Sequence, residues 1–142
     1  LQQLQQPLFN QALPFGVLCT LSDGSSACWD FSPQSWGETA QYIPLAVPPT
    51  TPLRLEHAKL SLRFKPAGAQ HSKALKDWCK SWHIAPWQRS RLMLFCALQQ
   101  LEAVVLPATA HTGTLQTYRQ TETAAAQSWL SILPVQALAK AD

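Results

Sequence analysis

Cysteine and histidine are the residue types in this 142-residue chain whose spacing could support chemistry. Cys79 and His83 lie four positions apart, so on a helix they would share one face and could supply two zinc ligands. A zinc site needs further ligands, and no second pair stands at ligand spacing. A Cys–His pair could also be nucleophilic, but no oxyanion or orienting motif accompanies it. We therefore expect no metal site and no catalytic residue.

The cysteines as a group indicate burial instead of reactivity. Cys19, Cys28, Cys79 and Cys96 stand among apolar or aromatic neighbours, and none of them forms a CxxC pair. Such cysteines are typical of free, buried thiols in a reducing compartment. A disulfide between Cys19 and Cys28 across a hairpin is the alternative, and it would require an oxidising environment.

Positive charge is concentrated in the middle of the sequence. Residues 54–91 contain nine Lys or Arg residues and two acids, whereas residues 1–53 contain three acids and neither Lys nor Arg. The net charge of the whole chain is only +3, so the distribution carries more information than the total. A local excess of this size favours a polyanionic partner.

Within this basic stretch, the spacing predicts one amphipathic helix over residues 72–83. Ser72 is a suitable N-cap, and Pro86 ends the helix because the residue before a proline avoids the α region. Apolar residues recur at i, i+3, i+4 and i+7, and lysines fall on the opposite face. The apolar stripe is Leu75, Trp78, Cys79 and Trp82, and the basic stripe is Lys73, Lys76 and Lys80. We expect the tryptophans to anchor the helix to a sheet.

The remaining pattern predicts strands. Two runs around Asp23-Gly24, GVLCTLS and SACWDFS, predict a hairpin. Apolar and polar residues alternate over 60–65, which predicts a half-buried strand with Arg63 and Lys65 outward. Residues 107–127 have a weak pattern and are expected to be mostly loop. Further strands are predicted at residues 41–47, 92–96, 101–106 and 129–133, with 92–96 central.

Composition agrees with many short elements, because the chain has 11 prolines and 5 glycines. We predict an α+β fold, with mostly antiparallel short strands in a sandwich or barrel-like sheet and one basic amphipathic helix packed on it. Residues 14–142 are interpreted as one domain. Residues 1–13 are Gln-rich and uncharged, and are interpreted as a leader or the tail of an upstream domain, either a short helix or disordered. The chain begins without Met, so we interpret it as part of a larger protein.

The segment RFKPAGAQHSKALKDWCKSWHIAPWQRSRLMLF resembles the C-terminal domain of tRNA(Ile)-lysidine synthetase. The resemblance covers about residues 60–106. The matching residues are Arg63, Phe64, Pro66, Gly68, Leu75, Lys76, Pro86, Trp87, Arg89 and Leu94, followed by Leu101-Glu102-Ala103-Val104. The departures mostly affect packing and turns: Ala85, Ser90, Met93, Glu102 and the turn at residues 97–100 differ from the family pattern.

The resemblance implies a role in tRNA modification. Enzymes of this family use ATP and Mg²⁺ to join lysine to the wobble cytidine of isoleucine tRNA. Their S-G-G-x-D-S pyrophosphate loop is not found here, since the nearest stretch, residues 22–26, has one glycine. The chain is therefore expected to need no cofactor of its own and to bind the tRNA acceptor region beside an upstream catalytic domain. A cytoplasmic location, no membrane contact and a possible homodimer complete these expectations.

The residues expected to contact tRNA carry the positive charge of the middle segment. Trp87 could be exposed, but we interpret it as a packing residue over the sheet. The alternative function is a protein-interaction or dimerisation module that binds no RNA, with the lysines as an ordinary solvated face. The candidate RNA-binding residues are Arg63, Lys65, His71, Lys73, Lys76, Lys80, Arg89 and Arg91.

Overall fold

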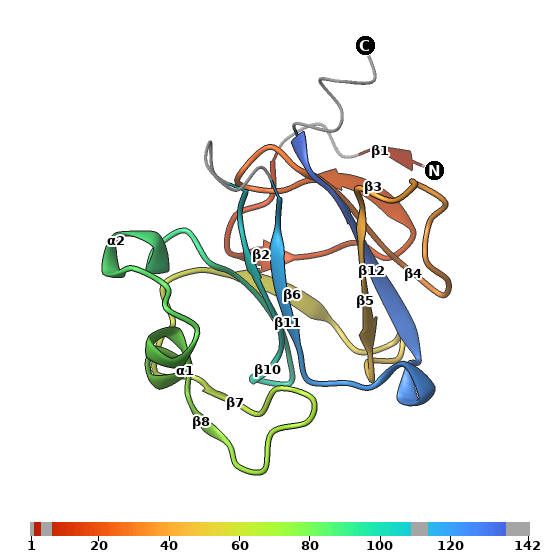
Figure 1. Cartoon of the computed structure of the whole chain (residues 1–142). Helices are drawn as coiled ribbons and strands as arrows, with labels where there is room; N and C mark the ends of the chain where they lie inside the picture. Colours follow the sequence, from red (N-terminus) through yellow and green to blue (C-terminus); the bar gives the residue numbers. More distant parts are fainter. Residues whose placement is uncertain (1, 4–6, 109–113, 136–142) are drawn as a thin grey trace.

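The computed structural model describes residues 2–3, 7–108 and 114–135, and it contains two five-stranded sheets that pack face to face (Figure 1). The first sheet has the order β1-β3-β4-β12-β5 and the second the order β11-β10-β9-β6-β2. The strands of the first sheet are β1 Gln2–Gln3, β3 Val17–Thr20, β4 Ser26–Asp30, β5 Gln41–Leu45 and β12 Ser128–Leu133. Those of the second are β2 Gln11–Ala12, β6 Leu53–Glu56, β9 Met93–Ala97, β10 Gln100–Leu106 and β11 Gln116–Arg119. The predicted sandwich of mostly antiparallel strands is confirmed.

The first sheet forms around the predicted hairpin. β3 and β4 pair antiparallel, and Gly24 at their turn has φ +90°, a value that favours glycine. The Asp23 carboxylate accepts hydrogen bonds from the Ser25 N–H and Oγ at 2.9 and 2.7 Å, which stabilises the turn. β12 confirms the strand predicted at residues 129–133, and it lies between β4 and β5.

β9 and β10 are the centre of the molecule, because every residue of β9 and all but the first of β10 are buried. Met93 and Phe95 point into the core between the two sheets, whereas Leu92 and Leu94 point into a second core on the other side. A sheet covered on both faces needs a continuous apolar run, which explains why this segment lacks polar alternation. The predicted central strand and its partner are confirmed.

The second core is covered by a third layer. This layer consists of the short pair β7 Arg63–Phe64 and β8 Lys73–Ala74, helix α1 Leu75–Ser81 and the one-turn helix α2 Pro86–Arg89. In Figure 1 these elements, drawn in yellow-green and green, lie together on one side of the second sheet. The layer contributes four buried residues to this second core: Phe64, Leu75, Cys79 and Ile84.

The helix predicted over residues 72–83 is wrong in extent. Lys73 and Ala74 pair with Phe64 and Arg63, so α1 begins only at Leu75. Ser72 does not cap it, because Ala74 holds the N-cap position and makes no side-chain hydrogen bond there. The helix ends before His83, which has φ +58°. A tertiary strand pairing therefore overrides the local capping signal.

Other strands were missed by the sequence patterns. β6 and β2 form one edge of the second sheet, and β11, at the other edge, lies in the segment predicted as loop. The helix considered for residues 1–13 is not found in its described part, where β1 and β2 are strands, and Leu8 and Leu13 are buried in the sandwich core. Residues 1, 4–6, 109–113 and 136–142 lie outside the described part of the chain. No helix in that part is long and apolar enough to span a membrane.

Candidate nucleic-acid interface

The third layer, residues 60–91, carries most of the positive charge, and we call it the basic layer. It contains seven Lys or Arg residues and one acid, Asp77. Backbone hydrogen bonds from Leu75 N–H to Leu62 O (2.8 Å) and from Lys76 N–H to Leu60 O (3.0 Å) join the start of α1 to the chain before β7. The pair β7–β8 and α1 thus form one continuous unit.

Trp78 of α1 and Trp82, the C-cap residue of α1, anchor this unit, as the sequence predicted. The Trp78 indole N–H donates to the Phe64 carbonyl oxygen at 2.6 Å. The Trp82 ring stacks on Tyr118 of β11, with centroids 3.7 Å apart and planes 7° apart. Trp78 and Trp82 also stack, at 5.7 Å. Tyr118 was missed because it lies in a Thr- and Ala-rich segment with no strand pattern.

The three predicted lysines do not share one helix face. Lys76 and Lys80 are exposed on α1, whereas Lys73 belongs to β8. Lys73 pairs with Phe64 in the short ladder of β7 and β8. The Lys73 Nζ lies 4.5 Å from the centroid of the Trp78 ring, a cation–π contact that leaves the lysine exposed. Lys80 lies 4.0 Å from Asp77 across a solvent-exposed gap.

Arg63 on β7, and Lys65 and His71 in the loop that joins β7 to β8, are exposed. The Arg63 guanidinium donates from Nη2 to the Ser72 carbonyl oxygen at 2.7 Å, and its Nε lies 3.3 Å from Ser72 Oγ. Arg63 therefore braces the loop that joins β7 to β8. That loop is also tied to the second sheet, since Ala67 N–H donates to Arg119 O at 2.8 Å.

Arg89 and Arg91 lie on and just after α2, with Arg91 exposed and Arg89 half-buried. Arg89 Nε donates to the Ile84 carbonyl oxygen at 3.3 Å. The interpretation of Trp87 as a packing residue is wrong, because 79% of its surface is exposed. Trp87 occupies the second position of α2, after Pro86, and α2 contains no buried residue.

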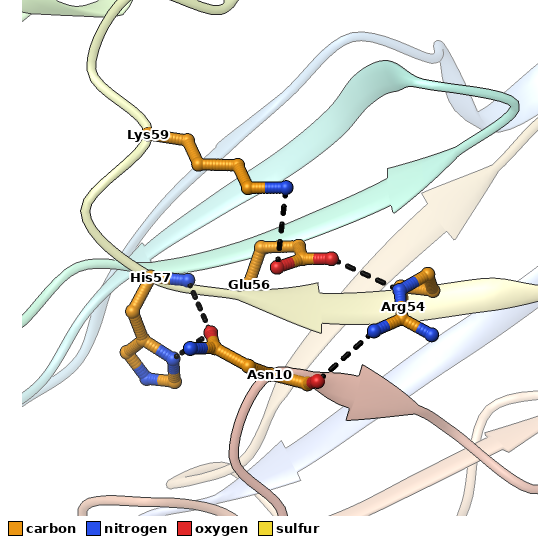
Figure 2. A network of polar contacts seen from close by, with 5 residues as sticks. All are labelled: Asn10, Arg54, Glu56, His57 and Lys59. Atoms are coloured by element: carbon orange, nitrogen blue, oxygen red, sulfur yellow. Dashed lines mark hydrogen bonds and ion pairs between the residues drawn. The ribbon is translucent and has the colours of Figure 1, made fainter.

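Two other cations of the middle segment are neutralised instead. On β6, Arg54 Nε donates to Glu56 Oε1 at 2.9 Å, and Lys59 Nζ lies 3.4 Å from Glu56 Oε2 (Figure 2). Asn10 joins this network, because its carbonyl accepts from Arg54 and its Oδ1 accepts from the His57 N–H. The hydrogen bond from Arg54 is the main cause that lowers the pKa of the Glu56 carboxyl. A groove of about 640 Å³ adjoins the network.

No such pairing holds the basic layer. Among the described residues, Asp77 is the only acid that approaches one of its cations within ion-pair distance, and it does so at the 4.0 Å limit. Lys76 and Lys80 on α1 and Lys73 on β8 therefore remain available to bind an external anion. The same holds for the arginines at α2, Arg89 and Arg91. The eight predicted residues all lie on the basic layer, from β7 to the end of α2.

The cysteines show no sign of reactivity. All four are free and buried, so the disulfide considered between Cys19 and Cys28 is not formed. Burial raises the pKa of the Cys19 and Cys96 thiols to about 11 and also raises that of Cys79. Cys79 lies in the second core and His83 is exposed, so they do not converge on a shared ligand. No cluster of three or more potential ligands occurs in the residues that the structure describes.

Comparison with known proteins gives one match. A family model described as the TilS substrate C-terminal domain matches residues 53–124, slightly more than half of the chain. The matched range begins at β6, contains the whole basic layer and the two central strands, and ends at the 3₁₀ turn Thr123–Ala125. No curated protein and no solved structure matches the chain significantly.

Proposed function

Since the chain belongs to the family of TilS substrate C-terminal domains, we propose that its basic layer holds the acceptor region of isoleucine tRNA for a lysidine-forming ligase. The family gives the chain a substrate-binding role in a tRNA-modifying enzyme. The acceptor region, the identity of the tRNA and the residues in contact with it are parts of the proposal. One observation carries it: seven cations and a single acid share one layer.

The chemistry of an RNA stem fits this layer. An A-form helix presents regularly spaced phosphates and a wide minor groove lined by 2′-hydroxyls. Exposed lysines and arginines on short, rigid elements hold phosphates and measure their spacing, but carry little sequence information. Lys76 and Lys80 lie one helical turn apart on α1, and Lys73 stands just before it on β8. We propose that they contact successive phosphates.

In this proposal the chain binds and does not catalyse. Its thiols are buried and hold their protons, since burial raises the pKa of Cys19 and Cys96 to about 11. ATP activation and lysine transfer, with Mg²⁺, would belong to an upstream catalytic domain of the same protein. The basic layer would then position the tRNA while a distant base reacts.

The proposal is tested by measuring the affinity of the 142-residue chain for transcribed isoleucine tRNA over a series of salt concentrations. If roughly five phosphates are neutralised, log K should fall against log salt with a slope near −4. A protein-interaction module without RNA affinity would instead give a salt-insensitive dimer in sedimentation and no binding isotherm. That result would remove the proposed function.

A further inference from the structure

The exposed indole of Trp87 is not explained by packing or by phosphate binding. The exposed fraction of Trp87 is 79%, and among the large hydrophobic residues of the described chain Leu98 has the same value. An exposed indole contributes little to packing and has a large face open to a ligand, so we ask whether a partner covers it. The question is which class of partner fits its surroundings.

Hydrogen bonds and buried neighbours fix the backbone around Trp87, so the position from which the indole projects is set before any ligand arrives. Ile84 and Leu92, on either side of α2, are both buried in the second core. The turn between them is closed by hydrogen bonds from Gln88 N–H to Ala85 O at 2.9 Å and from Arg91 N–H to Gln88 O at 3.0 Å. The Ala85 N–H also donates to the Gln88 side chain at 3.2 Å. Because this turn is already ordered, binding at Trp87 costs little backbone entropy.

The charged residues nearest to Trp87 along the chain are cations. Arg89 and Arg91 follow within four residues, and neither forms an ion pair with any described residue. Leu98, the equally exposed apolar residue, lies beyond the other end of β9, a strand that spans roughly 17 Å at about 3.3 Å per residue. A protein-docking site would need a contiguous apolar patch, and a single exposed indole followed in the chain by two arginines does not provide one.

An isolated aromatic ring flanked by cations matches the way proteins bind unpaired nucleotides. The ring stacks on a base, and the cations hold the adjoining phosphates. A base-paired stem does not offer the face of an internal base, whereas an unpaired nucleotide does, so we take the ligand to be an unpaired nucleotide. A tRNA acceptor stem ends in an unpaired 3′ segment, which supplies such bases next to the phosphates of the stem.

We propose that the Trp87 indole is a stacking platform for an unpaired nucleobase that adjoins the RNA helix held by the basic layer. This inference rests on the proposed function and adds to it a binding contact and a ligand class. Arg89 and Arg91 hold the phosphates on either side of the stacked base. The contact would mark the end of the stem and so fix the register of the RNA along Lys73, Lys76 and Lys80.

The test compares two RNA hairpins with the same stem, one blunt and one with a short single-stranded 3′ extension. The unaltered chain should prefer the extended hairpin by roughly ten-fold in Kd, about 1.4 kcal/mol. Trp87→Ala should reduce this preference to less than about two-fold and leave the affinity for the blunt hairpin unchanged. Trp87→Phe should keep part of the preference, because a smaller ring still stacks.

Leu98→Ala is the matched control, since both side chains are 79% exposed and only one is aromatic. It should leave the preference intact, and thermal melting of each variant verifies folding. If the unaltered chain binds both hairpins equally well, or if Trp87→Ala weakens both alike, the stacking proposal is overturned while RNA binding stands. If the chain binds neither hairpin, the proposed function fails and the inference fails with it. If Trp87→Ala changes only self-association, the indole contacts protein.

Discussion

Two groups of cations from the same stretch of sequence differ in the folded chain: one is paired with a carboxylate, and the other is largely unpaired. Arg54 and Lys59 at the β6 edge share the Glu56 carboxylate, within 2.9 and 3.4 Å (Figure 2). In the basic layer, a few residues further on, Asp77 is the one acid among the described residues that lies within ion-pair distance of any of the seven cations. Charge that is paired within a protein stabilises the fold, whereas charge that is left unpaired creates an external field. Sequence charge alone does not distinguish the two.

The difference follows from strand geometry. Arg54 and Glu56 stand two apart on β6, so their side chains project from the same face of the sheet. Leu53, before this pair, and Leu55, between its two residues, are buried in the sandwich core, and their burial fixes that orientation. In the basic layer, the lysines of α1 point outward because Leu75, Cys79 and the two tryptophans occupy the inner face. The same residue types thus become a structural network at one place and a candidate binding surface at the other.

The largest effect is expected from neutralising the basic layer. The triple variant Lys73→Ala/Lys76→Ala/Lys80→Ala should weaken binding to isoleucine tRNA about 100-fold at moderate salt and make the salt slope shallower by between two and three, since each lost phosphate contact removes roughly 0.7–0.9 from it. Filter binding or fluorescence anisotropy over a salt series measures both quantities. The melting temperature should change little, because all three side chains are exposed.

Single substitutions sharpen the comparison between the two groups. Lys76→Ala should cost about five-fold in tRNA affinity, whereas Lys59→Ala, a lysine already paired with Glu56, should cost less than about two-fold. Equal losses for both lysines would mean that pairing does not separate the groups. A triple variant that binds tRNA normally would contradict the assignment of the interface.

A smaller effect, on stability, is expected from Glu56→Gln. Removing the carboxylate leaves Arg54 and Lys59 without their counter-charge, which should lower the free energy of unfolding by about 1–1.5 kcal/mol and Tm by about 4 °C. Because the pKa of Glu56 is lowered in the folded state, its contribution is present at neutral pH and is lost as the pH falls through the folded pKa. The stability difference should therefore vanish in acid. A difference that persists at low pH would point to packing instead of charge.

The smallest effect is expected from Glu102→Gln, with the opposite sign. Glu102 on β10 is 7% exposed and accepts one hydrogen bond, from Gln120 Nε2 at 3.0 Å. Burial raises the pKa of the Glu102 carboxyl, so the ionised form costs stability at neutral pH and the cost disappears as the pH falls. The variant should raise the free energy of unfolding by about 0.5 kcal/mol and Tm by about 2 °C at pH 7. Thermal melts from pH 4 to 8 would record the convergence, and a variant less stable than the parent at pH 7 would contradict it.

The sequence predicted those elements of the fold whose structure follows from a single local pattern of residues. The run at 92–96 reads as a central strand because each of its residues is apolar, and both faces of β9 are indeed covered. The hairpin at Asp23-Gly24 follows from turn chemistry, and the inward tryptophans follow from helical spacing. The helix start failed because Ser72 offers a local cap, whereas the chain gains more by pairing Lys73 and Ala74 with β7.

The candidate site was predicted in composition but not in detail. Its eight residues lie on one layer, yet Lys73 belongs to a strand and Arg63 braces a loop. Missing β6 also hid the pairing of Arg54 with Glu56, because that pairing depends on a strand spacing of two. The sequence left the exposure of Trp87 open, and we chose packing wrongly, since the pattern around a proline-started turn does not say which side faces water.

The sequence by itself determined the positions of the positive charge and of the continuous apolar runs along the chain. It could do so because charge and hydrophobicity are properties of each residue. Only the tertiary structure decided which cations are neutralised and which indole is left in water. Those outcomes depend on distances of a few ångströms between residues far apart in the chain, such as Asn10 and Arg54 or Trp82 and Tyr118. Such distances arise when the two sheets and the basic layer pack together.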